Sequence, residues 1–145
     1  MKAPPKGWPR MSASLYYEDP HAAIDWLCRA FGFEVQLKVE GDGGEIVHSE
    51  LKYGDALVMV SERGGKEPWQ AMYRTPREIG GCITAALALF VEDVDAHHAR
   101  AVAAGAKVVR ALATSDYGDD YWSDRSYGAT DLAGHLWWFM QRMRG

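Results

Sequence analysis

An internal repeat constrains the fold of this chain more than any other feature. The segment LYYED at residues 15–19 matches LFVED at residues 89–93, so the two copies are offset by 74 positions. Each match ends in an aspartate that can cap a helix, and the helices that follow are predicted to end at Gly32 and Gly105. A repeat of this kind indicates two copies of one supersecondary unit.

The first copy begins with a strand pattern. Side chains alternate between two faces from Met11 to Tyr17, and the pattern changes to helical spacing after Asp19 and Pro20. Glycine and aspartate clusters divide the remainder into three short strand candidates. These candidates span residues 34–39, 45–53 and 56–61. The first copy therefore has the order β-α-β-β-β.

The second copy repeats this order. Alternation from residue 83 to residue 91 predicts its first strand, and Asp93 is expected to cap its helix. Its later strands are predicted at residues 107–112, 125–131 and 136–141. The first two of these strands are separated by a longer loop at residues 115–123.

The length of 145 residues suits one domain. Two βαβββ units in that length predict an α+β fold whose strands form a cupped mixed sheet around a central cavity, with the helices on the outside. The predicted parts are an N-terminal arm at 1–10, the first unit at 11–62, a connecting loop at 63–81 and the second unit at 82–142. The connecting loop is long enough to indicate either mobility or a function.

Charge and composition exclude several classes of partner. The chain has 16 Lys and Arg against 20 Asp and Glu, a formal charge of −4, and no dense basic cluster of the kind that binds nucleic acid. It also lacks the run of about 18 apolar residues that a membrane span requires. Its two cysteines stand in unrelated settings, which predicts reduced thiols. We therefore expect a soluble cytoplasmic protein with neither nucleic acid nor membrane as its partner.

Aromatic residues are abundant, because 6 Trp, 7 Tyr and 4 Phe make up 12% of the chain. So many rings either fill a core or line a surface that binds flat apolar ligands. Alternation along the first strand of each copy predicts which residues point away from the helix, and small residues among them leave room for a pocket. The residues on this predicted face are Ser12, Ser14, Tyr16, Ala86, Ala88 and Phe90.

Three segments carry a resemblance to a known family. They are AIDWLCRAFGFEV at 23–35, VEDVDAHHARAVAAGAKV at 91–108 and DRSYGATDLAGHLWWF at 124–139. With the paired βαβββ units, they make residues 11–142 resemble the vicinal oxygen chelate superfamily. That superfamily includes glyoxalase I, the extradiol dioxygenases, fosfomycin resistance enzymes and the bleomycin resistance proteins. The resemblance implies a homodimer, and it leaves the activity open because one fold carries many functions.

The enzymes of that superfamily hold a divalent metal with His and Glu side chains from the first and last strands of each unit. In this sequence, the corresponding positions fall on Ser12, Ala86 and Trp138, and near Val58 or Met59. None of these side chains is a good metal ligand. The resemblance therefore points to the metal-free bleomycin resistance proteins, and we predict no metal and no cofactor.

His48 and Glu50 share one face of a predicted strand, where they could hydrogen-bond or protonate a ligand. The same pattern also fits a solvated sheet face. Trp138 is predicted to project a flat indole into the space that a metal would occupy, with plain packing as the alternative.

The loop at residues 115–123 mixes aspartates with aromatic rings. Over a cavity mouth it would attract a cationic or aromatic molecule, with Tyr121 and Trp122 as parts of a lid. A solvated loop or a subunit interface is equally compatible with this composition. His97 and His98 are predicted at the surface or its boundary, and Trp26 is predicted to face a partner chain.

The leading hypothesis is metal-independent binding of a small aromatic or cationic molecule in the cavity between the two units. Antibiotic sequestration of the bleomycin resistance type is its concrete form. The competing hypothesis is a glyoxalase-like lyase, isomerase or dioxygenase, which would use His48 and Glu50 as its catalytic groups or a non-standard metal site.

Overall fold

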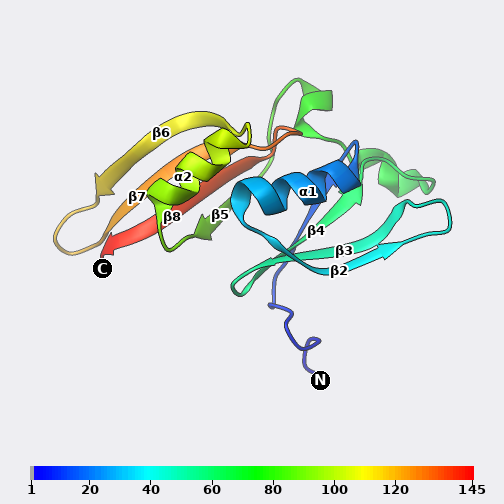
Figure 1. The fold of residues 1–145 in the computed structure, drawn as a ribbon, viewed down its shortest axis with the longest axis horizontal. Coiled ribbons are helices and arrows are strands. Elements are labelled where there is room, and N and C mark those ends of the chain that lie inside the picture. Colours follow the sequence, from blue (N-terminus) through cyan, green and yellow to red (C-terminus); the bar gives the residue numbers. More distant parts are fainter. Residues whose placement is uncertain (1) are drawn as a thin grey trace.

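The computed structural model describes residues 2–145 (Figure 1). The chain folds into two four-stranded mixed sheets, each with one α-helix. The first sheet has the strand order β1-β4-β3-β2, with β1 parallel to β4. The elements of this first unit are β1 (Ala13–Tyr17), α1 (Pro20–Phe31), β2 (Glu34–Glu40), β3 (Ile46–Tyr53) and β4 (Ala56–Glu62). The predicted βαβββ order of the first copy is confirmed.

The second sheet repeats this topology with the order β5-β8-β7-β6 and a parallel β5–β8 pair. Its elements are β5 (Ala86–Phe90), α2 (Val94–Ala103), β6 (Lys107–Asp116), β7 (Ser123–Thr130) and β8 (Leu136–Arg144). Two short 3-10 helices, η1 (Pro68–Met72) and η2 (Pro76–Ile79), interrupt the connecting segment. The predicted α+β fold of two βαβββ units is therefore confirmed. Within residues 2–145, neither α-helix is long and apolar enough to cross a membrane.

The hairpin between β6 and β7 differs from its prediction. The pairs Ser115↔Asp124 and Asp116↔Ser123 continue the ladder into the predicted loop, so only residues 117–122 remain at the tip. The residues that extend β6 are mostly exposed and polar, and they show no alternation of polar and apolar side chains. Backbone pairing holds them in the strand, and periodicity cannot detect that pairing.

Both helices begin at the predicted aspartate caps. Asp19 Oδ1 accepts a hydrogen bond from the Ala22 amide at 3.0 Å, and Asp93 Oδ1 accepts one from the Ala96 amide at 2.9 Å. The first helix ends at Gly32, whose φ of 81° lies in the left-handed region that favours glycine.

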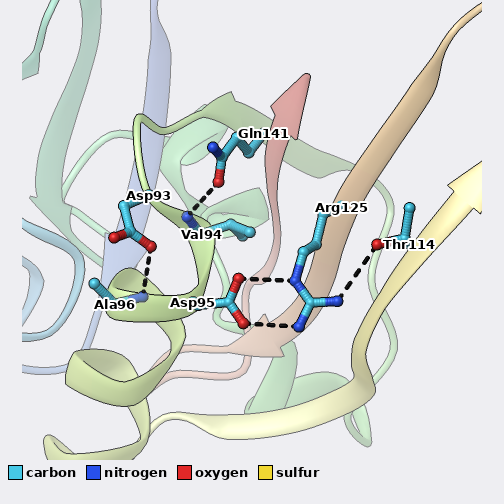
Figure 2. Close-up of polar contacts among 7 residues, drawn as sticks. All are labelled: Asp93, Val94, Asp95, Ala96, Thr114, Arg125 and Gln141. Carbon is cyan, nitrogen blue, oxygen red and sulfur yellow. Dashed lines mark hydrogen bonds and ion pairs between the residues drawn. The ribbon is translucent and has the colours of Figure 1, made fainter. Parts of the chain in front are cut away.

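Helix α2 is also fastened to the second sheet (Figure 2). Arg125 on β7 donates from Nε and Nη2 to the two carboxylate oxygens of Asp95, at 2.8 and 2.7 Å. The Gln141 side chain on β8 accepts a hydrogen bond from the Val94 amide at 3.1 Å. Helix α2 therefore covers this face of the sheet. Because side chains alternate along a strand, the neighbouring residues of β7 and β8 lie on the opposite face.

One core serves both units, and His97 lies inside it. The His97 side chain is only 8% exposed, with Nε2 at 2.9 Å from the Phe31 carbonyl oxygen and Nδ1 at 2.6 Å from the Tyr127 hydroxyl. A neutral ring satisfies both contacts if Nε2 donates to the carbonyl and Nδ1 accepts from the hydroxyl. Burial lowers the pKa of His97.

The predictions for His97 and Trp26 were therefore wrong. Helix α2 packs against α1, which covers the side of α2 that an isolated helix would expose. Trp26 is buried, and its Nε1 donates to the Ala104 carbonyl oxygen at 2.8 Å, so its partner is the other unit of the same chain. Helical periodicity cannot show contacts between elements 78 residues apart.

Asp131 joins the two units from a buried position. Its Oδ2 accepts hydrogen bonds from the Tyr17 hydroxyl at 2.7 Å and Trp137 Nε1 at 3.1 Å. Its Oδ1 accepts from the Ala133 and His135 amides, both at 3.0 Å. One carboxylate thus satisfies four donors and fixes β1 of the first unit against the β7–β8 turn of the second.

Candidate functional site

Each helix covers one face of its sheet and leaves the other face open. Leu15 and Tyr17 are buried under α1, so Ser14 and Tyr16 point to the opposite face of the first sheet. We call this open face, which also bears His48 and Glu50, face A. The open face of the second sheet, which bears Phe90, Arg110, Trp138 and Arg142, is face B.

The predicted site residues are divided between these two faces. Across residues 2–145, the two sheets share no strand pairing, and no hydrogen bond or aromatic contact joins face A to face B. A hollow of 240 Å³ between the units is lined by Ser14 and Tyr16 together with Ala85 and Leu87. Neither Phe90 nor Trp138 lines it, so the predicted site residues do not share one cavity within a single chain. Tyr16, His48 and Glu50 belong to face A, whereas Phe90 and Trp138 belong to face B. Ser12 precedes β1 at the edge of face A.

The polar centre of face A is a buried carboxylate. Glu50 is 6% exposed, and it accepts hydrogen bonds from His48 Nε2 at 2.8 Å and from Gln36 Nε2 at 2.7 Å. These bonds from His48 and Gln36 lower the pKa of Glu50 because they stabilise its ionised form. Trp8 in the N-terminal arm stacks parallel to the His48 ring, with centroids 6.5 Å apart. The arm thus lies against face A.

The connecting segment covers another part of face A. Tyr16 stacks on Tyr73 with ring centroids 4.0 Å apart, and Tyr73 meets the edge of Trp69 at 5.4 Å. Burial and the neighbouring Tyr73 raise the pKa of Tyr16 to about 12. A hollow of 680 Å³ lies beside this stack, with Val47 and Ser61 among its lining residues. None of the residues that line it belongs to face B.

The central feature of face B is a row of four residues across the sheet. Strand register places Ala88, Trp138, Gly128 and Arg110 side by side on β5, β8, β7 and β6. A Cβ atom on Gly128 would lie 2.9 Å from Cζ3 of the Trp138 ring. The φ of Gly128 lies outside the left-handed region, so the glycine is required here for space rather than for its backbone conformation. Its missing side chain lets the indole rest against β7.

Two arginines adjoin the aromatic rings of face B. The Arg110 guanidinium carbon is 5.6 Å from the centre of the Trp138 ring. The Arg142 guanidinium carbon is 5.4 Å from the Phe90 ring and 5.3 Å from the Trp122 ring. Such contacts hold cation and ring together by electrostatic attraction of about 0.5–1 kcal/mol at exposed positions. Face B is therefore aromatic, with two guanidinium groups beside its rings.

The tip of the β6–β7 hairpin reaches face B through Trp122. Trp122 contacts Arg142, and the neighbouring Tyr121 is 62% exposed with its ring 6.0 Å from that of Trp122. Two of the four aspartates nearby are paired with arginines, whereas Asp119 and Asp120 at the tip form no ion pair among residues 2–145. Asp124 pairs with Arg142 at 2.5 Å, and Asp116 pairs with Arg144 at 2.6 Å. These ion pairs weaken the expected attraction of the loop for a cation.

Sequence reasoning missed Arg110, Gly128 and Arg142. Arg142 is four residues beyond Trp138 in the same strand, so alternation could have placed it on the same face. Arg110 and Gly128 reach Trp138 only through the pairing of three strands, which no local pattern encodes. The sequence places Trp8 in the predicted N-terminal arm and gives no sign of its contact with His48.

The positions that correspond to metal ligands in the resembled enzymes carry other side chains here. Met59 pairs with Ser14 on the side of face A, whereas Val58 is buried under α1. Ala86 and Trp138 lie on face B. In the part of the chain that the structure describes, residues 2–145, no three His, Cys, Asp or Glu side chains lie together as a metal site would require.

The comparison with known families agrees with this architecture. Residues 11–139 match the Glyoxalase/Bleomycin resistance protein/Dioxygenase superfamily, and the chain belongs to that superfamily. It is 34% identical over 141 residues to the uncharacterized protein Rv0887c of Mycobacterium tuberculosis (strain ATCC 25618 / H37Rv), an alignment that covers 94% of this chain and 76% of the relative. The predicted family resemblance is confirmed.

Two solved structures are also similar. TioX from Micromonospora sp. ML1 has a TM-score of 0.69 and 35% identity, covering 92% of this chain and 95% of TioX. TnmS3, an antibiotic binding protein from Streptomyces sp. CB03234, has a TM-score of 0.62 and 19% identity, covering 92% of this chain and 96% of TnmS3. The second likeness establishes a shared fold and nothing further.

Proposed function

We propose that this protein binds an aromatic small molecule without a metal ion, with Trp138 as the stacking surface. The observation that supports this most directly is the indole of Trp138, which rests against Gly128 on an open sheet face. A bound ring that stacks on an indole gains about 0.5–1.5 kcal/mol beyond the area that it buries. Phe90 and Trp122 both contact the Arg142 guanidinium and add aromatic area to the same surface.

The proposed ligand is aromatic rather than simply cationic. The expectation of a cation rested on the acidic hairpin, where Asp116 and Asp124 are paired with arginines, so that within residues 2–145 only Asp119 and Asp120 at the exposed tip form no ion pair. Sequestration of an aromatic antibiotic in the cytoplasm is the biological form of this proposal. The shared fold with TnmS3, an antibiotic binding protein, is compatible with that role.

We also propose that a second copy of the chain completes the pocket. The single chain of 16.1 kDa exposes 9017 Å², whereas a monomer of this mass is expected to expose about 7,400 Å². That excess is larger than the ~800 Å² per partner that a standard interface buries. Leu37, Val39 and Val47 are exposed in the first sheet, and Phe90 is 52% exposed on face B. A two-fold dimer would cover both sets of apolar side chains.

Sedimentation velocity tests the dimer. We expect a mass about twice 16.1 kDa at micromolar concentration. Phe90→Glu should shift the protein toward the monomer, because the charge would be buried in the interface. The matched control is Val102→Glu, which places the same charge at an exposed position of α2. A wild-type protein that sediments as a monomer would contradict the proposed dimer.

The competing enzymatic hypothesis gains no support from the geometry of His48 and Glu50. A general base works best with a pKa near the working pH. The hydrogen bonds from His48 and Gln36 move the pKa of Glu50 in the opposite direction, which weakens it as a base. The pair is better suited to holding a ligand than to abstracting a proton from it.

Fluorescence titration of metal-stripped protein tests the proposed function. After EDTA treatment, we expect bleomycin-type and planar aromatic antibiotics to quench tryptophan emission. Trp138→Leu should weaken binding about tenfold, the loss of one good stacking contact. Trp26→Phe removes an indole between the two helices and should leave the affinity unchanged. No quenching by any compound, or binding that returns only with a stoichiometric metal, would refute the proposal.

A further inference from the structure

Arg110 differs from the other arginines of the second sheet. Strands β6, β7 and β8 carry four arginines, and across residues 2–145 three of them form ion pairs with carboxylates within 4 Å. These pairs are Arg125–Asp95, Arg142–Asp124 and Arg144–Asp116. Arg110 alone among the four has no carboxylate at that distance in the described chain. No ion pair among residues 2–145 therefore compensates its positive charge.

Neutral groups nevertheless hold Arg110 in place. Its Nη1 donates to Ser126 Oγ at 3.3 Å, and its Nη2 donates to Ser115 Oγ at 3.2 Å. Because guanidinium has five N–H donors, several remain available for another acceptor. The hydroxyls orient the group without cancelling its charge, and its guanidinium carbon lies 5.6 Å from the centre of the Trp138 ring.

The row across face B sets the distance between charge and stacking surface. Gly128 separates Arg110 from Trp138 by one strand, and it contributes no side chain to block a molecule that lies over both. A flat ligand on the indole would therefore reach the guanidinium with a group at its rim. Planar oxyanions match the fork of guanidinium, which can donate two parallel hydrogen bonds to them.

From this geometry we infer that Arg110 binds an acidic group on the aromatic ligand, so that the ligand class is an aromatic carboxylate or a similar aromatic oxyanion. The inference rests on the proposed function and adds the charge of its ligand. Trp138 supplies stacking for the ring, and Arg110 supplies selectivity for the acid. A charge-assisted hydrogen bond of this type corresponds to about a tenfold gain in affinity.

Three probes of one shape test this inference by isothermal titration calorimetry. They are 2-naphthoate, its neutral amide 2-naphthamide, and the cation 2-naphthylmethylammonium. We expect the wild-type protein to bind the acid about tenfold more tightly than the amide, and the cation most weakly. Arg110→Gln should bind acid and amide equally, while Arg110→Lys should retain part of the preference because it keeps the charge.

The control variant is Arg125→Gln, which removes a guanidinium from the helix-covered side of the same sheet. It should preserve the preference for the acid, with circular dichroism confirming the fold of each variant. Equal binding of acid and amide by the wild type would overturn the inference and leave the proposed function intact. The inference would also be overturned, and the proposed function left intact, if Arg110→Gln kept the preference for the acid over the amide. The same holds if the only effect of Arg110→Gln were to weaken dimer formation. Failure of all three probes to bind would overturn both proposals.

Discussion

Face A and face B come from two copies of one βαβββ unit, yet they differ in their side chains and in the segments that cover them. Segments outside the repeat cover face A, where Trp8 stacks on His48 and Tyr73 stacks on Tyr16. Face B lacks such a cover, and it presents Trp138 beside an arginine with no carboxylate partner in residues 2–145. The two units share one backbone topology but carry different side chains on these faces. The polar groups of face A are satisfied within the chain, whereas face B retains groups that can bind a ligand.

Removal of the junction between the units should have the largest effect. Asp131→Ala leaves the Tyr17 hydroxyl, Trp137 Nε1 and two amides without their acceptor. We expect a loss of about 3 kcal/mol in the free energy of unfolding, because buried donors without partners are costly. Urea titration followed by circular dichroism measures it. Asp119→Ala, at the exposed hairpin tip, should change stability by less than about 0.5 kcal/mol. Similar values for the two variants would show that the junction is unimportant.

A methyl group at Gly128 should damage face B alone. Gly128→Ala must displace the Trp138 ring, since the added Cβ would lie 2.9 Å from it. We expect about a tenfold loss of affinity for 2-naphthoate. In a Trp138→Leu background the same substitution should have no further effect, because its action passes through the ring. Additive losses in the double variant would disprove that coupling.

Acidification should weaken the core between the units through His97. Burial places the folded-state pKa of His97 below its unfolded value of about 6.5. The unfolded chain therefore binds the proton first, and stability should fall as the pH decreases from about 6.5 toward the folded-state pKa. Above that window the contribution is fully present. Unfolding free energies from pH 8 to pH 5 measure the slope.

His97→Gln should flatten this slope, whatever it does to stability at neutral pH. His98→Gln, one residue along the same helix, should leave the slope in place. An unchanged slope in His97→Gln would assign the pH dependence to other groups.

The smallest effect is expected from the N-terminal arm. Trp8→Ala removes the ring that stacks on His48 and should cost less than about 1 kcal/mol of stability, because the contact is near the surface. NMR shifts of the His48 ring protons should nevertheless move as the indole leaves. If those protons keep their shifts, the arm does not rest on face A in solution.

Local patterns predicted the parts of the fold that local physics determines. The caps at Asp19 and Asp93, the glycine stop at Gly32 and the alternation of Tyr16 and Tyr17 each depend on residues a few positions apart. The extension of β6 to Asp116 escaped prediction because its support comes from pairing with β7. Burial of His97 escaped for the same reason, since its partners are 30 and 66 residues away.

The sequence by itself determined a duplicated βαβββ chain whose usual metal positions carry Ser12, Ala86 and Trp138. The duplicated order follows from residue chemistry and short-range periodicity, whereas the metal positions are those that the family resemblance implies. Only the tertiary structure decided that the site is divided between two faces and that Arg110 lies in one row with Gly128 and Trp138. Register between strands is fixed by the packing of the whole sheet. The residues that lie beside Trp138 on neighbouring strands therefore cannot be identified from their positions along the chain.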